Sequence, residues 1–182
     1  MKRTINSIQF LGILFTAAFF TSCSDGVTLQ RYYVDHQESK NFISQDLPIS
    51  MLKIDQTNFT EDQQEAYKSV NKLNVLGYKA NANDLEAYNA ELEAVKTILS
   101  DAKYNELMEF SDKGNKVYVK YIGDDEEADE VVVFGSAKGT GFGIVRILGD
   151  DMSPDKMVTL IDVLKKTDVD EKQFDELLNF FK

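Results

Sequence analysis

The sequence predicts an α+β fold, in which an antiparallel-rich sheet of four or five strands has helices packed against it. Three observations lead to this prediction. Residues 116–148 hold three β-rich runs joined by short loops, which is typical of a three-strand meander. Amphipathic helical patterns stand before and after these runs. A further run, Leu73–Lys79, alternates like a strand.

The first 22 residues are typical of a secretory signal peptide. Lys2 and Arg3 supply a positive start, and residues 8–20 form an uncharged, mostly apolar stretch. This stretch is too short to span a membrane, which takes about 20 apolar residues. Its length suits a signal that is removed on export.

Cys23 is the only cysteine, and the small residues Thr21 and Ser22 stand directly before it. This arrangement resembles a bacterial lipoprotein signal, although Phe20 stands where leucine is usual. The resemblance implies cleavage before Cys23 and lipidation of that residue. The alternative is an ordinary cleaved signal with an incidental cysteine.

The chain accordingly divides into a signal peptide (1–22), a lipidated cysteine with a short tether (23–28) and a single α+β domain (29–182). The sequence has 31 acidic and 20 basic residues, a net charge of −11. An acidic surface repels phosphate backbones, so we expect no nucleic-acid partner. It also disfavours adsorption to anionic lipid, so the acyl anchor on Cys23 would hold the protein at the membrane.

The first half of the domain alternates between helical and extended patterns. A capping box at Thr60–Gln63 begins one helix, and the apolar stripe of another could form a coiled-coil seam or lie on the sheet. The stripe is too short for a sustained coiled coil, which favours the sheet. The predicted elements are a helix over Leu29–His36, a strand followed by a helical turn within 41–53, helices over 61–71 and 85–100, and the strand Leu73–Lys79.

The second half is predicted to contain the meander between helices. We expect a short helix over 101–110, then strands over Lys116–Ile122, Glu130–Gly135 and Phe142–Leu148. Ser153 and Pro154 form a helix start, with Met152 and Met157 as a hydrophobic staple. Asp168 is predicted to cap a last helix, on which Phe174, Leu177, Leu178 and Phe181 share one face.

One series of segments carries a family resemblance. It consists of Tyr104–Met108, the strand Lys116–Tyr121, an acidic hairpin, Glu130–Val133, and Phe142–Gly149 before a capped helix. The series resembles an uncharacterised domain-of-unknown-function family of Bacteroidetes cell-envelope lipoproteins, over about Leu29 to Leu164. The resemblance implies a lipid-anchored envelope domain. Its motifs are packing and turn residues, so it implies no catalytic residue.

His36 is the only histidine of the chain. A general base needs a nucleophile beside it, and the anchor would consume the only cysteine. The neighbours Asp35 and Glu38 favour a solvated helix face for His36. Zinc sites built from cysteine and histidine are excluded by count.

Two loops have patterns that could bind an ion. The acidic run of Asp124, Asp125, Glu126, Glu127, Asp129 and Glu130 could offer oxygens to calcium, but it lacks the spacing of a calcium loop, and charges at a hairpin tip usually serve solubility. Lys138–Gly143 is glycine-rich like a phosphate loop. It lies between two predicted strands rather than before a helix, which favours a hairpin turn. Paired carboxylates for glycoside hydrolysis stay open, because spacing in sequence does not give spacing in space.

These observations predict no cofactor, no metal site and no catalytic residue, and Cys23 as the one modified residue. The leading hypothesis is a lipid-anchored, non-catalytic envelope protein that binds an envelope protein partner. Its expected location is the outer membrane, facing the periplasm. One alternative is an envelope hydrolase that uses carboxylates only. Another is an accessory of an envelope-stress signalling system.

Overall fold

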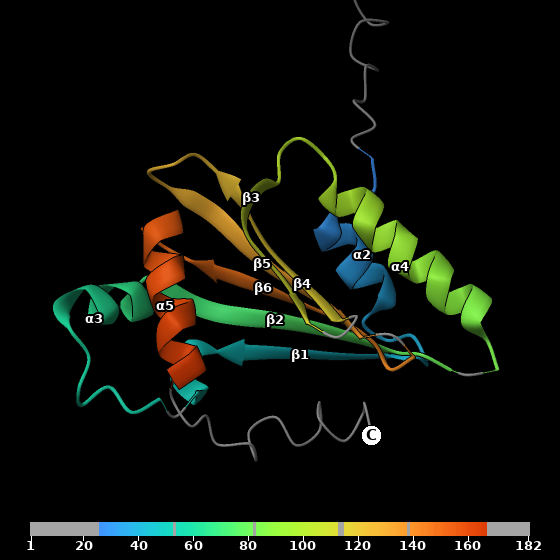
Figure 1. Cartoon of the computed structure of the whole chain (residues 1–182), viewed down its shortest axis with the longest axis horizontal. Coiled ribbons are helices and arrows are strands. Elements are labelled where there is room, and N and C mark those ends of the chain that lie inside the picture. The colour runs from blue at the N-terminus through green and yellow to red at the C-terminus, as the bar shows by residue number, and fades with distance from the viewer. Residues whose placement is uncertain (1–25, 53, 82, 113–114, 138, 167–182) are drawn as a thin grey trace, which may run out of the picture.

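A computed structural model of the chain describes residues 26–52, 54–81, 83–112, 115–137 and 139–166 (Figure 1). The elements in chain order are α2 (Leu29–His36), β1 (Phe42–Pro48), the 3-10 helix η2 (Ile49–Met51), α3 (Glu61–Lys68), β2 (Val70–Lys79), α4 (Leu85–Leu99), β3 (Asn105–Asp112), β4 (Asn115–Gly123), β5 (Ala128–Ala137), β6 (Gly141–Gly149) and α5 (Pro154–Lys166). The predicted signal peptide, Cys23 and the predicted last helix lie outside the described residues. Within them, no helix is long and apolar enough to cross a membrane.

The strands form one antiparallel sheet in the order β1-β2-β6-β5-β4-β3. The α+β prediction and the meander are confirmed, since β4, β5 and β6 are neighbours in sequence and in the sheet. The meander includes β3 as a further strand beside β4, and β2 pairs with the other edge of β6. The sheet therefore has six strands rather than the predicted four or five.

The additional strand is β3, which stands where a short helix over 101–110 was predicted. That prediction is wrong, because residues 105–112 form a strand that pairs with β4. Met108 lies opposite Val119 and Phe110 opposite Val117. Leucine, methionine and glutamate favour helices locally, but strand pairing and side-chain packing outweigh that preference here.

The predicted helix starts at Thr60 and Ser153 are confirmed by their hydrogen bonds. The Thr60 backbone N–H donates to Gln63 Oε1 at 3.0 Å, and the Gln63 N–H donates to Thr60 Oγ1 at 3.3 Å. The Lys156 N–H donates to Ser153 Oγ at 3.3 Å. The α3 helix ends at Lys68, three residues earlier than predicted, because β2 already begins at Val70.

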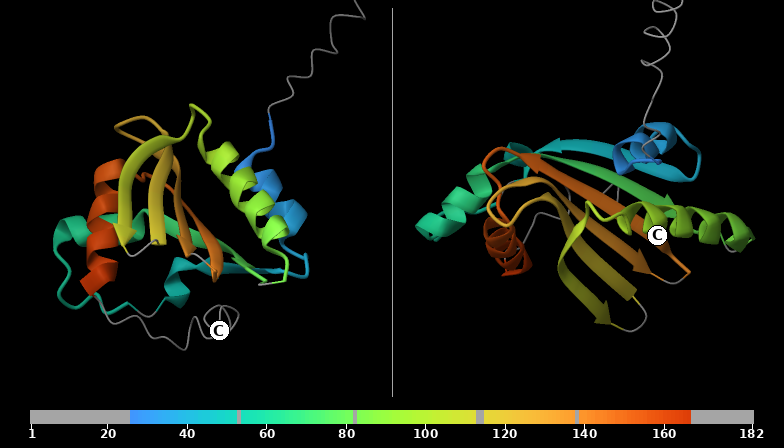
Figure 2. Two further views of the ribbon diagram at one scale, coloured as in Figure 1. Left: turned by 45° about the vertical axis from the view of Figure 1, so that its right-hand side comes forward. Right: turned by 90° about the horizontal axis from the view of Figure 1, so that it is seen from above.

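One face of the sheet is covered by α2 and α4, as the views in Figures 1 and 2 show. The apolar stripe of α4 packs there on the sheet, as predicted, and not in a coiled-coil seam. This first core cluster is rich in aromatic rings. Its largest members are Tyr32, Tyr33, Tyr78, Tyr88, Tyr104, Phe134 and Phe142.

The other face is covered at the opposite end of the strands by α3, α5 and η2 (Figure 1). Met152 and Met157 are both buried in this second core cluster, which confirms the predicted staple. Strand β5 lies between the two clusters. Its Val132 belongs to the first and its Val131 to the second, so the strand is covered on both faces, as its sequence predicts.

Candidate functional site

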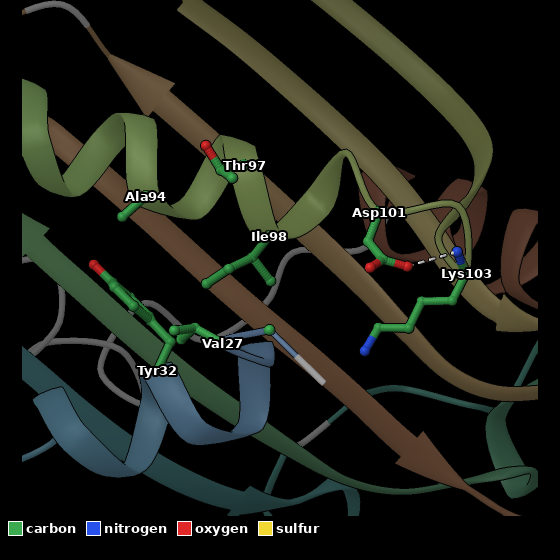
Figure 3. A pocket seen from close by; sticks show the side chains of 8 residues that line it. Val27, Tyr32, Ala94, Thr97, Ile98, Asp101 and Lys103 are labelled. Atoms are coloured by element: carbon green, nitrogen blue, oxygen red, sulfur yellow. Dashed lines mark hydrogen bonds between the residues drawn. The ribbon is translucent and has the colours of Figure 1, made fainter. Parts of the chain in front are cut away.

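A groove runs between α4 and the chain segment that leads into α2 (Figure 3). Its volume of about 550 Å³ lies in the range of small-molecule sites. Val27, Ala94, Ile98 and the Tyr32 ring provide apolar surface. Polar groups gather beyond the end of α4, where the Lys103 N–H donates to Asp101 Oδ1 at 3.0 Å.

Local sequence signals position both helices. Thr28 caps α2, because its hydroxyl accepts from the Arg31 N–H at 3.2 Å. Asp84 caps α4, because its carboxylate accepts from the Ala87 N–H at 3.2 Å. The helical period then turns Tyr32 toward α4 and Ile98 toward the sheet, since both side chains belong to the first core cluster.

Tyr32 also takes part in a polar cluster that joins the two helices. Its hydroxyl donates to Glu91 Oε2 at 2.7 Å. Burial, and then the hydrogen bond to Glu91, raise the pKa of Tyr32 far above its ordinary value. The Tyr32 hydroxyl therefore stays protonated and holds the Glu91 carboxylate in place.

His36 completes this cluster from the end of α2. Its Nδ1 lies 2.7 Å from the carbonyl oxygen of Tyr32, which only accepts, so Nδ1 carries a hydrogen. Its Nε2 lies 3.5 Å from Glu91 Oε2. Protonation of the ring would thus turn the contact with Glu91 into an ion pair.

The environment of His36 differs from the predicted solvated face. Its ring stacks on Tyr32, with 4.1 Å between centroids, and lies 4.8 Å from the ring of Phe42. The His36 side chain is 24% exposed. No local sequence pattern predicts these contacts of His36, because Phe42 lies on another element and Glu91 lies far along the chain.

The comparison with protein families yields one match. A family model described as Domain of unknown function (DUF4252) matches residues 32–160, which is more than half of the chain. The chain belongs to this family. The matched residues run from Tyr32 in α2 to Leu160 in α5 and include all six strands. Neither a curated protein nor a solved structure matches the chain.

The match confirms the predicted resemblance to a domain-of-unknown-function family; the affiliation with Bacteroidetes lipoproteins stays a prediction. The Tyr32–Glu91–His36 cluster lies inside the DUF4252 region. Gly26 and Val27, which line the groove on the side of the chain start, lie before it. The groove is thus lined partly by residues of the DUF4252 region and partly by Gly26 and Val27, which follow Cys23 closely in the sequence.

The acidic run lies in the β4–β5 hairpin of the DUF4252 domain. Asp124 Oδ1 accepts the backbone N–H groups of Glu126 and Glu127 at 2.9 Å each, and these bonds lower the pKa of Asp124. Tyr121 donates to Asp125 Oδ1 at 3.1 Å. Among the described residues, no group of three or more histidine, cysteine or acidic side chains is placed to hold a metal ion.

Glu130 does not belong with these hairpin charges, which corrects the grouping made from the sequence. It lies within β5, and both its oxygens accept from Arg146 of β6, from Nε and Nη2 at 2.7 Å each. Both side chains are nearly buried. The sequence feature that could have predicted this ion pair is the lone arginine in the otherwise apolar strand Gly141–Gly149.

The glycine-rich run forms the β5–β6 hairpin, which confirms the predicted turn. The Thr140 N–H donates to the Ala137 carbonyl at 3.1 Å. Gly139 has φ +81°, a conformation that favours glycine. Lys138 lies outside the described residues.

Proposed function

We propose that this chain is a lipid-anchored, non-catalytic binding module of the cell envelope, and that it binds an envelope protein in the groove beside α4. The observation that carries the proposal is the position of the groove. Gly26 lines it and follows Cys23 by three residues. Three extended residues reach only about 10 Å, so an acyl anchor on Cys23 would hold the groove close to the membrane surface.

The lining of the groove supports a protein ligand with an apolar segment. Val27 is 62% exposed, and it lines the groove together with Ala94 and Ile98. Asp101 and Lys103 offer one charge of each sign at one end. A ligand segment with a short apolar side chain followed by a polar group would fit an apolar groove that has charged groups at one end. Polar groups at an apolar site fix the orientation of the ligand.

Site-specific photocrosslinking in the native envelope tests this assignment. A benzoylphenylalanine at position 94 points into the groove, whereas one at position 90 is exposed one turn earlier on α4 and does not line it. We expect position 94 to capture one envelope protein that position 90 does not capture. Adding Val27→Glu should abolish the capture, because Val27 lines the groove, is 62% exposed in the free protein and would carry a charge that is costly to bury under an apolar ligand. Equal patterns at positions 94 and 90 would refute binding in the groove.

One observation favours a second candidate, the carboxylate-only hydrolase. Glu91 is 28% exposed, so its carboxylate can reach solvent and could act as a general base. Hydrolysis of envelope glycans or esters that Glu91→Gln abolishes, with the fold retained, would favour this candidate over the binding module.

The third hypothesis, an accessory role in envelope-stress signalling, is a special case of binding. The identity of the protein captured at position 94 distinguishes it, since a signalling component would have to be that partner.

A further inference from the structure

A second, smaller pocket lies between the end of α4 and strands β4 and β5. We call it the lysine pocket; it is lined by Lys96, Leu99, Ser100, Tyr118, Lys120 and Phe134. None of these residues lines the groove, which uses the other side of α4. The volume of the lysine pocket is about 140 Å³. An apolar cavity of about 150 Å³ can hold one benzene molecule, so this pocket has room for one aromatic ring.

The floor of the lysine pocket is apolar and aromatic. Leu99 and Phe134 belong to the first core cluster and are 4% and 1% exposed. The half-buried Tyr118 ring is stacked with Phe134, with 6.2 Å between centroids and 13° between ring planes. A ligand ring in the pocket could pack against these side chains, as aromatic rings do in protein cores.

One face of β4 brings lysines to this floor. Lys116, Tyr118 and Lys120 alternate along the strand, so all three point to the same face of the sheet. The Lys116 Nζ lies 3.4 Å from the Tyr118 hydroxyl and 6.0 Å from the centroid of its ring. Their partners in β5 are uncharged: Ser136, Phe134 and Val132. Positive charge thus gathers here in a chain whose net charge is −11.

Lys96 brings a further ammonium group from the last turn of α4. Its Nζ lies 2.8 Å from Glu93 Oε1, and both side chains are largely exposed. Exposed ion pairs of this kind contribute little to stability, so Lys96 can turn to another anion at small cost. Lys96 also offsets the partial negative charge at the C-terminal end of the helix.

Lys120 has acidic residues nearby on β3 but forms no ion pair with them. Glu106 lies opposite Lys120 in the strand register and Glu109 lies opposite Tyr118, and both glutamates are exposed. In the part of the chain that the structure describes, Lys120 belongs to none of the ion pairs. It is nevertheless half-buried, and it lines the pocket. A ligand anion would supply the missing counter-ion.

We infer that the lysine pocket binds a small, free carboxylic acid that carries one aromatic ring. The ring lies on Leu99 and Phe134 beside Tyr118, and the carboxylate accepts hydrogen bonds from the Lys120 and Lys96 ammonium groups. The apolar floor strengthens these ion pairs relative to open water. An inorganic anion would leave the floor uncovered. The site is separate from the groove, and the inference does not rest on the proposed function.

An NMR titration of the full chain, purified in detergent, tests this inference with 3-phenylpropionate as the probe. We expect saturable shifts of the amide resonances of Leu99, Ser100 and Lys120, and none at Val27 in the groove. The uncharged 3-phenylpropionamide has the same ring and should bind at least about tenfold more weakly, because it lacks the charge that the lysines recognise. Acetate keeps the charge without the ring and should also bind at least about tenfold more weakly.

A matched pair of variants assigns the binding to the pocket. Lys120→Gln should weaken binding of 3-phenylpropionate at least about tenfold. Lys72→Gln makes the same change of charge at an exposed residue of β2 that does not line the pocket, and should leave binding unchanged. If Lys120→Gln disturbs the fold, the comparison of acid with amide in the wild-type chain still decides.

Three results would overturn the inference. One is the absence of saturable shifts at the pocket residues, and another is equal affinity for 3-phenylpropionate and its amide. The third is a tripeptide ending in phenylalanine that binds at least about tenfold more tightly than 3-phenylpropionate. The pocket would then recognise the end of a protein chain rather than a free acid.

Discussion

Arg146 donates two hydrogen bonds to Glu130, from Nε to Oε1 and from Nη2 to Oε2, each 2.7 Å long. The two residues come from neighbouring strands, and their side chains are 10% and 12% exposed. The hydrogen bond to Glu130 raises the pKa of Arg146, so the guanidinium stays charged. This pair is the one buried ion pair among the described residues.

We predict that Glu130→Gln destabilises the domain, because it leaves the Arg146 charge buried without its counter-ion. Breaking a buried pair on one side typically costs about 3–5 kcal/mol. Urea unfolding followed by circular dichroism measures the change. Replacing both partners, with Arg146→Met and Glu130→Leu, should recover most of the loss. A Glu130→Gln domain as stable as the wild type would mean that water reaches the guanidinium.

The buried tyrosines predict a loss of stability in alkali. Burial is the first cause that raises the pKa of Tyr32, Tyr33 and Tyr104 above the ordinary value of 10.0. Below that pH both folded and unfolded chains keep these protons, and the contribution to stability is complete. Above it the unfolded chain ionises first, so the free energy of unfolding falls by at most about 1.4 kcal/mol per pH unit for each tyrosine.

The measurement is the urea midpoint as a function of pH between about 9 and 11. Tyr32→Phe should flatten this dependence, since it removes the group whose pKa is raised most. The same slope in Tyr32→Phe and wild type would contradict the assignment of Tyr32 as a buried, protonated donor.

Gly149 marks a close approach of two strands. A Cβ at this position would collide with the backbone carbonyl of Ser69, at the junction between α3 and β2. Gly149→Ala should therefore destabilise the domain by about 1–3 kcal/mol, in the range of overpacked sites. Gly26→Ala is the matched control, because its Cβ would meet nothing within 4 Å. Equal melting temperatures for the two variants would show that the strands can separate at no cost.

Most of the fold prediction rests on short sequence patterns, such as helix caps and apolar stripes. The caps at Thr60 and Ser153 and the stripe on α4 are each contained within one turn or one helix, and all are confirmed. Strand β3 was missed because its local preference is helical and only its partner strand holds it extended. An edge strand pairs with a neighbour on one side only. Its own sequence is therefore a weak indication that the segment is a strand.

The candidate site was harder to predict because its contacts are distant in sequence. His36 and Glu91 meet only through the packing of α2 on α4, and Glu130 and Arg146 only through the register of β5 with β6. In the sequence Glu130 was indistinguishable from the hairpin carboxylates beside it. Register decides which of these carboxylates is buried, and no local pattern encodes it.

The central claim, that the domain is lipid-anchored through Cys23, is tested most directly by the mass of the mature protein. We expect the chain isolated from membranes to begin at Cys23 and to carry covalent acyl chains on that residue, so that detergent, and not salt, releases it. Cys23→Ala should leave the precursor uncleaved and free of acyl chains. A wild-type protein without acyl chains, cut at another position and recovered in the soluble fraction, would contradict the account.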